Sequence, residues 1–444
     1  DGLTTLAGSS GTGAALTITH SGILAINDTT GTADTTNADI DIDGAFNQND
    51  SGGVEIAGDI TTTNDTIDFN GPLTLTGALA LSAGSGTITF DNTVNGDGLG
   101  PWALTLNSTG TTDINDTIGG TNPLSSITTD TGGTTSIGDN ITTATHTYND
   151  AVILDTQPIT LTGTNGTWNG TVDGAGGAGQ DLILDFTGGA VFNGVVGGSE
   201  SIGDGIGASI TINSSGTTTF ASTLSTAQGI TQADGAGLLT FQDDVTINTG
   251  TTPTTFNADV TLDGLTITSY GNIVFGNEST DQVQLSSAAT IINMAGNNID
   301  ILSAVDGNQG LTLNSTGTTS ISGTIGGTTP VASLTTDFGG TSLLSSNISG
   351  QTGNIVFNDD VEINDSITIQ NANGGGLIFD RTVNGNNDLV LAITGNTSFN
   401  AALGDTTALG DGTGNSLTIN STGATVFTST LTTADGILQA DSAG

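Results

Sequence analysis

Apolar and polar residues alternate along most of the chain, in short runs that turn residues separate. The segment Leu73–Phe90, LTLTGALALSAGSGTITF, is representative, because Leu, Ala and Ile alternate with Thr and Ser, and Gly interrupts the runs. A period of two residues places the apolar side chains on one face of a strand. The pattern predicts many short strands, and it argues against disorder, the alternative that few aromatic residues and a high net charge suggest.

Composition agrees with an all-β fold. The 444 residues include 69 Gly and one Lys or Arg, and Glu supplies few of the 44 acidic residues. Asp, Asn, Gly and Thr favour turns and strands over helices. The length exceeds that of one ordinary globular core, although no shift in composition separates domains. The chain has no Cys, so disulfides do not contribute to its stability.

A long passage of the chain occurs twice. Residues Ala103–Gly133 return with few changes as Gly310–Gly340, 207 residues later. The same offset relates two further pairs of segments, Asp181–Gly198 with Asp388–Asp405 and Ser209–Gly237 with Ser416–Gly444. Self-similarity at a fixed period indicates a repeat architecture. We therefore expect tandem modules of one continuous solenoid: the end of a preceding module in 1–21, one module in 22–228, a second in 229–435, and the start of a further module in 436–444.

A shorter unit lies inside each module. An aromatic or large aliphatic residue, usually followed by Asn or Asp, precedes a Val or Leu by four positions, as in FNGPL at Phe69 and FNDDV at Phe357. These units recur every 21 residues or so, and each is too small to bury its own apolar face. Stacked turn upon turn they would bury it, so the sequence predicts a parallel β-helix (β-solenoid) of about 21 residues per turn, ahead of a sandwich of hairpins. The aromatic residues are predicted to form an internal ladder, in preference to a sugar-stacking strip on the surface.

The net charge of −43 limits the partners of the chain. Nucleic acids and anionic membranes attract Lys and Arg, so neither is an expected partner. No apolar run is long enough to span a bilayer, and no signal peptide is present, so we expect no membrane insertion. Because the chain starts at Asp1, we interpret it as a processed or internal segment whose targeting sequence has been removed.

Closely spaced acidic residues suggest a cation site. The segment ADIDIDG places Asp39, Asp41 and Asp43 on one face of a strand, where a divalent cation such as Ca²⁺ would relieve their repulsion. The pairs Asp243–Asp244 and Asp359–Asp360 add to this possibility. The alternative is a solvated acidic face with loosely held counterions.

Three loops share the pattern GDGxG, beginning at Gly96, Gly203 and Gly410. They are faintly similar to calcium-binding nonapeptides, but the nine-residue period is absent. We interpret them as corners between strands, in which Gly supplies positive φ and Asp caps the turn.

Catalytic residues are hard to find in the sequence. His20 and His146 lie far apart, and Arg381 is the sole residue of the Lys/Arg type. A polysaccharide lyase of the β-helix kind needs more basic groups than this to stabilise its anionic intermediate. A hydrolase needs only two carboxylates, and that alternative stays open. We expect no enzymatic activity.

The repeated sequence motifs resemble those of a known family. The passages LTLNSTGTT (residues 104–112 and 311–319), GTIGGT and SLTTD, with YNDAV at Tyr148, are similar to the β-helical stalks of filamentous-haemagglutinin-like adhesins and related large bacterial surface proteins. The resemblance covers most of the chain and implies export to the cell surface and a fibrous role. It carries over no active-site residue.

These observations lead us to expect an extracellular structural fibre or surface stalk. The main alternative is a solenoid whose Thr rows recognise an ordered surface of polysaccharide or ice, although the Thr-x-Thr segments look scattered in the sequence. A polysaccharide-degrading β-helix enzyme is the third reading. Since Gly436–Gly444 resembles Gly229–Gly237 and no polar capping segment appears at either terminus, we expect the chain to be continued at both ends, by further covalent repeats or by stacking on identical chains.

Overall fold

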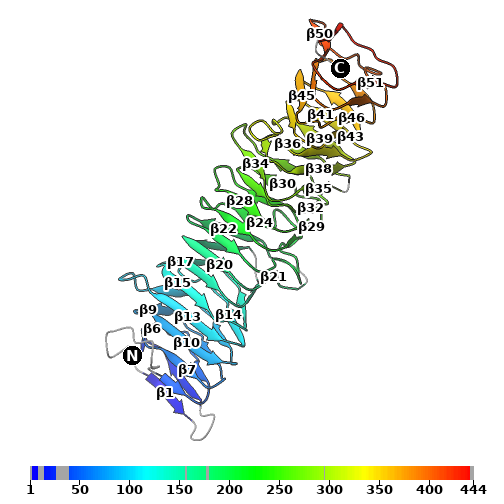
Figure 1. The fold of residues 1–444 in the computed structure, drawn as a ribbon. Coiled ribbons are helices and arrows are strands. Elements are labelled where there is room, and N and C mark those ends of the chain that lie inside the picture. Colours follow the sequence, from blue (N-terminus) through cyan, green and yellow to red (C-terminus); the bar gives the residue numbers. More distant parts are fainter. Residues whose placement is uncertain are drawn as a thin grey trace. The chain divides into compact units, whose positions relative to one another are not determined.

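The computed structural model describes residues 3–8, 15–26, 40–155, 158–176, 180–294 and 296–440. These residues form an all-β structure without helices, in which parallel strands stack as a β-solenoid of about 18 turns with roughly 22 residues per turn (Figure 1). The predicted fold class is confirmed, and the predicted turn length of about 21 residues is close to the observed one. None of the described residues belongs to a helix that could span a membrane.

The chain divides into two compact units. Unit 1 comprises residues 1–205 with 209–227, and unit 2 comprises residues 206–208 with 228–444. In each unit three faces of stacked strands surround the core. We call them A1, B1 and C1 in unit 1, and A2, B2 and C2 in unit 2.

Unit 1 has the following strands. Face A1 contains β2 (Leu16–His20), β5 (Phe46–Gln48), β8 (Ile67–Phe69), β11 (Ile88–Phe90), β14 (Thr111–Ile114), β16 (Thr134–Ile137), β18 (Ala151–Leu154), β21 (Val172–Gly174) and β26 (Leu224–Thr226). Face B1 contains β3 (Leu24–Ile26), β6 (Val54–Ile56), β9 (Leu73–Leu75), β12 (Val94–Gly96), the start of β17 (Ile141–Tyr148), β19 (Ile159–Gly163), β22 (Leu182–Phe186) and β24 (Ile210–Ile212). Face C1 contains β4 (Ile40–Ile42), β7 (Ile60–Thr62), β10 (Leu79–Gly84), β13 (Ala103–Ser108), β15 (Leu124–Thr129), the end of β17, β20 (Asn165–Trp168), β23 (Ala190–Phe192) and β25 (Thr218–Phe220).

Unit 2 repeats this arrangement. Face A2 contains β30 (Thr254–Phe256), β33 (Ile273–Phe275), β36 (Ile299–Ile301), β39 (Thr318–Ile321), β41 (Thr341–Leu344), β44 (Asp360–Ile363) and β47 (Val383–Asn384), preceded by β27 (Ile230–Gln232). Face B2 contains β28 (Leu239–Phe241), β31 (Val260–Leu262), β34 (Gln282–Leu285), β37 (Ala304–Asp306), β42 (Ile348–Gly350), β45 (Ile367–Asn371), β48 (Leu389–Ile393), β50 (Asn415–Ile419) and β52 (Gly436–Gln439). Face C2 contains β29 (Val245–Ile247), β32 (Thr266–Ser269), β35 (Thr290–Met294), β38 (Gly310–Ser315), β40 (Ser333–Thr336), β43 (Ile355–Phe357), β46 (Leu377–Phe379), β49 (Thr397–Phe399) and β51 (Thr425–Phe427).

The sequence repeat is visible in the strand bounds. Strands β13 and β14 of unit 1 return as β38 and β39 of unit 2 at the 207-residue offset. The boundaries of the predicted modules themselves stay a prediction.

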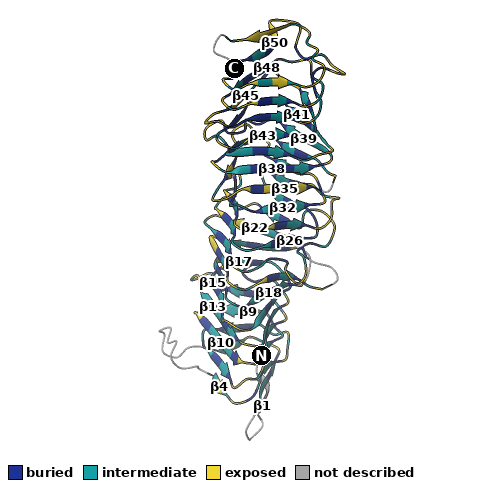
Figure 2. Ribbon diagram, turned by 45° about the vertical axis from the view of Figure 1, so that its right-hand side comes forward, coloured by how far each residue is buried: buried dark blue, intermediate teal, exposed yellow. Residues whose placement is uncertain are grey.

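Alternation along each strand places one side chain in the core and the next outside. In β8, for example, Ile67 and Phe69 are fully buried and Asp68 between them is half-buried. Figure 2 shows the same alternation of dark blue and teal segments on many strands. Because stacked strands are in register, equal positions of neighbouring turns lie directly over one another.

The aromatic ladder is confirmed as a feature of the core. Phe357, Phe379 and Phe399 are at most 1% exposed, and their ring centroids are 5.3 and 4.9 Å apart in sequence order. The ladder is, however, divided. In unit 1 one stack lies on face A1 and ends at Phe90, and another lies on face C1 and begins at Tyr148. The turns in between are filled on face A1 by aliphatic residues, among them Ile114 and Ile137, which the sequence motif predicted for these positions.

One strand departs from the parallel arrangement. Strand β1 (Leu3–Gly8) pairs with β2 in the antiparallel direction. It therefore covers the edge of β2, whereas the sequence predicted an open strand edge there.

Candidate functional site

A buried carboxylate bridges two turns of unit 1. Asp150 follows strand β17 and is 3% exposed. Its Oδ1 accepts a hydrogen bond from Thr129 Oγ1 at 2.6 Å, and its Oδ2 accepts one from Thr135 Oγ1 at 2.9 Å. Both Thr residues belong to the preceding turn, on β15 and β16. The carboxylate thus connects successive turns without a cationic partner among these contacts.

Unit 2 contains the same arrangement. Asp359 is 1% exposed, and it accepts hydrogen bonds from Thr336 Oγ1 at 2.7 Å and from Ser342 Oγ at 2.9 Å. Thr336 and Ser342 lie 207 residues after Thr129 and Thr135, the two donors to Asp150. Asp359 lies 209 residues after Asp150, so the donors keep the offset of the long repeat while two additional residues precede the acceptor in unit 2.

The residue before each buried carboxylate fixes one of the hydroxyl groups. The backbone N–H of Asn149 donates to Thr129 Oγ1 at 3.1 Å, and Asn149 Nδ2 donates to the Thr129 carbonyl at 2.7 Å. Asn358 makes the same two bonds to Thr336, at 3.2 and 2.6 Å. Each of these Thr hydroxyl groups thus accepts an N–H and donates its own proton to the carboxylate.

Burial dominates the electrostatics of both groups. Loss of solvation raises the pKa of the Asp150 and Asp359 carboxyl groups, and the hydroxyl hydrogen bonds only partly oppose the rise. The nearby carboxylates of Asp130 and Asp337 raise the pKa values further. The one ion pair found among the described residues joins Arg381 to Asp360 at 4.0 Å, so the chain's single Arg is engaged elsewhere.

Face C1 presents a row of hydroxyl groups. Outward-facing residues at one strand position pair in register over four successive turns: Thr105, Thr128, Thr147 and Thr167. All four are half-buried, and the strands from β7 to β25 on this face contain no charged residue. Neighbouring strands are about 4.8 Å apart, so the row is regular along the face. The Thr residues that look scattered in the sequence are thus brought into one column, which we call the hydroxyl column.

The corresponding column of face C2 is partly apolar. Thr312 and Thr335 are followed there by Val356 and Ile378. The run of Thr residues is thus longer on face C1, where Val191 follows the fourth Thr, than on face C2, where Val356 follows the second.

The predicted cation site stays a prediction. Asp39 lies outside the described residues, and Asp41 and Asp43 are exposed on and just after β4. Within the described ranges, no three His, Asp or Glu side chains form a group that could hold a metal ion. Of the additional pairs proposed from the sequence, Asp243 and Asp244 are exposed. In the last pair, Asp359 is directed into the core while Asp360 faces Arg381, so these two carboxylates do not share one surface.

The GDGxG loops have the geometry of corners. Asp97 Oδ1 accepts hydrogen bonds from the Leu99 N–H at 2.9 Å and from Trp102 Nε1 at 2.8 Å, and these bonds lower the pKa of the Asp97 carboxyl. Asp411 caps its loop in the same way through the N–H and hydroxyl of Thr413. Glycines of all three loops adopt positive φ, including Gly98 at 77°. The corner interpretation is confirmed.

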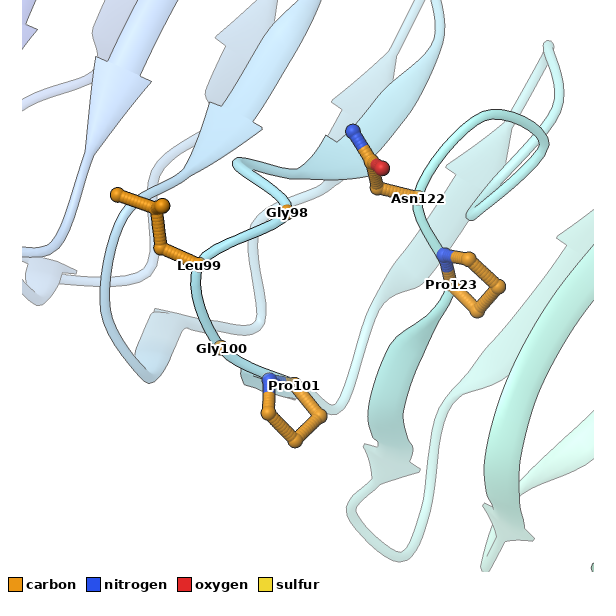
Figure 3. A pocket seen from close by; sticks show the side chains of 6 residues that line it. All are labelled: Gly98, Leu99, Gly100, Pro101, Asn122 and Pro123. Carbon is orange, nitrogen blue, oxygen red and sulfur yellow. The ribbon is translucent and has the colours of Figure 1, made fainter.

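A shallow hollow lies beside the first of these loops (Figure 3). It is lined by Gly98, Leu99, Gly100, Pro101, Asn122 and Pro123. The Leu99 side chain is 90% exposed. No acidic, basic or imidazole group belongs to this lining, so the hollow has no group for acid–base chemistry.

The histidines are core residues. His146 is fully buried against Trp168 and Phe186, and burial lowers its pKa to about 4. His20 is 2% exposed and hydrogen-bonds Gln48 Nε2 at 2.9 Å. The structure does not bring the two imidazoles together, since they lie on faces A1 and C1 in turns far apart.

The pKa of one half-buried carboxyl group is strongly raised. Burial and the neighbouring Asp204 carboxylate raise the pKa of Asp181 to about 6. In unit 2 the pKa of the equivalent residue, Asp388, is raised by burial and by the charges of Asp411 and Asp435. Sequence reasoning missed Asp181, Asp388 and Asp150, and it placed Asp359 in a cation-binding pair, because only the fold shows which Asp side chains lose water.

In comparisons with known proteins, no family model matches the chain, and neither a curated protein nor a solved structure matches it. The architecture nevertheless defines its class. The protein is a β-helical repeat protein, built as a β-solenoid with internal stacks and outward-facing polar columns.

Proposed function

We propose that the protein is an extracellular structural fibre or surface stalk, comparable in role to the filamentous-haemagglutinin-like adhesin stalks that its repeats resemble. One observation carries the proposal: successive turns pair in register through parallel strands, and equal side chains stack over one another. In such a solenoid each turn contacts its neighbours, so length is added by repetition alone. No enzymatic activity is part of the proposal.

Surface charge suits this role. With a net charge of −43, copies of the protein repel one another from the side, which favours solubility. The interior needs no salt bridges, because hydrogen bonds between strands and burial of apolar side chains hold the turns together.

Self-association at a strand edge is the second part of the proposal. On β52 the inward-register residue Ile437 is 46% exposed, whereas Leu417, its partner on β50, is fully buried. An edge of this kind is a template for another strand. We infer that a further solenoid turn stacks on β52, supplied by more repeats of a longer chain or by a second copy. At the other end β1 already pairs with β2, so the proposed stacking does not include the edge of β2.

The test combines microscopy with an edge variant. Negative-stain images of native material should show fibres, and the purified chain should associate in a concentration-dependent manner by analytical ultracentrifugation. Ile437→Lys should abolish the association, because a buried unpaired charge would oppose stacking. The matched control Thr406→Lys carries the same charge on an exposed loop and should associate like the unmodified chain. Discrete monomers of the unmodified chain at all concentrations, with no fibres in native material, would contradict the proposal.

The hydroxyl column supports a second candidate function, recognition of an ordered neutral surface such as a crystalline polysaccharide. The column is regular, uncharged and free of aromatic platforms, which fits a periodic array of sugar hydroxyl groups. In a pull-down with microcrystalline cellulose, unmodified protein should bind and a Thr128→Glu/Thr147→Glu variant should not. Equal retention of both proteins would exclude the column as the binding face, and a parallel ice-recrystallisation assay would test ice as the surface.

A further inference from the structure

We propose that the carboxyl groups of Asp150 and Asp359 each link one turn of the solenoid to the preceding turn, and that this link is stronger when the carboxyl group is neutral. The two links would then contribute more stability in weak acid than at neutral pH. This property is independent of whether the solenoid is a fibre or a binding protein.

Geometry provides the first argument. Each carboxyl group is fully enclosed, bridges two turns and has two hydroxyl partners. Thr129 and Thr336 accept the N–H groups of Asn149 and Asn358 and donate their own protons to the carboxyl groups. The second hydroxyl of each site has no such constraint. A neutral carboxyl group can therefore donate its proton to this second oxygen, Thr135 Oγ1 or Ser342 Oγ, and still accept from the first.

The ionised form is held by the two hydroxyl groups and by the backbone N–H of the same Asp residue, but by no cation among the described residues. A buried carboxylate normally requires a cation or several N–H donors. Asp150 faces Asp130 from β15 and its turn, and Tyr148 from β17, whose phenol is itself buried and neutral. The adjoining His146 is held neutral by burial. None of these groups offers a positive charge.

The surroundings of Asp359 lead to the same result. It faces Asp337 from the preceding turn, and its chain neighbour Asp360 is the acid that approaches Arg381. The Arg381 guanidinium lies 3.9 Å from the centre of the Phe338 ring, where it stacks instead of entering the core. The arrangement therefore favours the neutral carboxyl group in both units.

Linkage gives the sign of the effect. Both pKa values are raised above the ordinary value for Asp. Between the ordinary and the raised pKa the folded state binds more protons than the unfolded state, so stability falls as pH rises through this window. The stability that the neutral groups contribute is fully present below the ordinary pKa of Asp. The buried His146 acts in the opposite direction, because its pKa is lowered to about 4 and stability is lost as the pH falls from the ordinary His value toward 4.

The experiment compares thermal unfolding by circular dichroism at about pH 7.5 and about pH 4.5, at constant ionic strength. For each protein the acid gain is the melting temperature at about pH 4.5 minus that at about pH 7.5, and protonation of His146 in the unfolded state lowers this gain equally in all variants. In the Asp150→Asn/Asp359→Asn variant, the amides reproduce the neutral carboxyl groups at every pH. Its melting temperature should be raised at neutral pH, and its gain in acid should be clearly smaller. The control Asp185→Asn/Asp405→Asn removes the same charge from exposed positions and should retain most of the gain.

A second variant keeps the test decisive if the Asn variant fails to fold. Thr129→Val/Thr336→Val removes the fixed hydroxyl donors at nearly constant volume, which weakens the ionised form more than the neutral form. Its acid gain should exceed that of the unmodified protein. The proposal is overturned if the Asn variant has the same acid gain as the Asp185→Asn/Asp405→Asn control, or if the Thr→Val variant has no larger acid gain than the unmodified protein.

Discussion

At the scale of single residues, the inward positions of the turns carry most of the stability. Phe379 illustrates this, since its ring is fully buried between Phe357 and Phe399 and nearly parallel to both. A buried aromatic ring contributes by the apolar area it removes from water and by the stacking contacts to its neighbours.

Replacing Phe379 tests this contribution. Phe379→Ala should lower the free energy of unfolding by about 3–5 kcal/mol, because the ring leaves a cavity. Phe379→Leu should lower it by about 1 kcal/mol, because most of the volume is kept. The control is Phe338→Ala at an exposed ring, where only the contact with Arg381 is lost and about 0.5–1 kcal/mol is expected. Urea unfolding measures all three, and equal effects at both positions would contradict the ladder.

Calcium tests the acidic residues of the first turns. If Asp39, Asp41 and Asp43 bind Ca²⁺, micromolar to millimolar Ca²⁺ should raise the melting temperature by mass action, and chelator should reverse the rise. Asp41→Asn/Asp43→Asn should remove the effect. A melting temperature that responds to neither Ca²⁺ nor chelator, at constant ionic strength, would leave only loosely held counterions.

At the scale of elements, glycines at the corners allow successive turns to approach. Gly216 packs against Gly188 one turn earlier, where an added Cβ would overlap the Gly188 carbonyl oxygen. Gly423 and Gly395 form the same contact 207 residues later. These glycines are conformationally ordinary, with no positive φ, so close approach of the backbones is the reason for them.

A single methyl group tests the corner. Gly216→Ala should lower the free energy of unfolding by about 1–3 kcal/mol, because the neighbouring corners must move apart. The nearby Gly189 provides the control, since its added Cβ would meet only the Thr217 carbonyl oxygen at 3.9 Å. Gly189→Ala should be neutral or stabilise by up to about 1 kcal/mol. Equal stability of the Gly216→Ala and Gly189→Ala variants would show that the corner at Gly216 can accommodate a methyl group.

At the scale of the whole molecule, charge and repetition dominate. The net charge of −43 is spread mainly over loops, whereas most strands carry no charged residue. Self-repulsion of this kind opposes the folded state, and mobile ions screen it.

Salt should therefore stabilise the protein. Raising NaCl from about 10 mM to about 150 mM shortens the screening length from about 30 Å to about 8 Å, so the melting temperature at neutral pH should rise. The rise should be smaller at about pH 4, where many carboxylates are protonated. A melting temperature that falls with salt would indicate that attractive ion pairs dominate, contrary to the single pair found in the described part of the chain.

The sequence by itself determined the fold class, the approximate turn length and the inward aromatic positions. Each of these depends on local periodicity: a period of two residues sets the buried face of a strand, and a repeat of about 21 residues sets the turn. In a solenoid a residue contacts mainly the turns before and after it, so a short stretch of sequence already contains most of the information about its packing.

Only the tertiary structure decided which residues share a column. Because the loops between strands differ in length, the number of residues between stacked positions changes from one turn to the next. One aromatic stack therefore ends on face A1 and another begins on face C1. The same variation aligns four Thr residues in one column, Thr105, Thr128, Thr147 and Thr167. It also buries Asp150 against hydroxyl groups 15 and 21 residues earlier, while other Asp residues remain in water. The antiparallel β1 also lay beyond the repeat pattern. Burial of a carboxylate depends on partners in another turn, and the spacing of those partners is set by corner geometry, which the periodicity of the sequence does not encode.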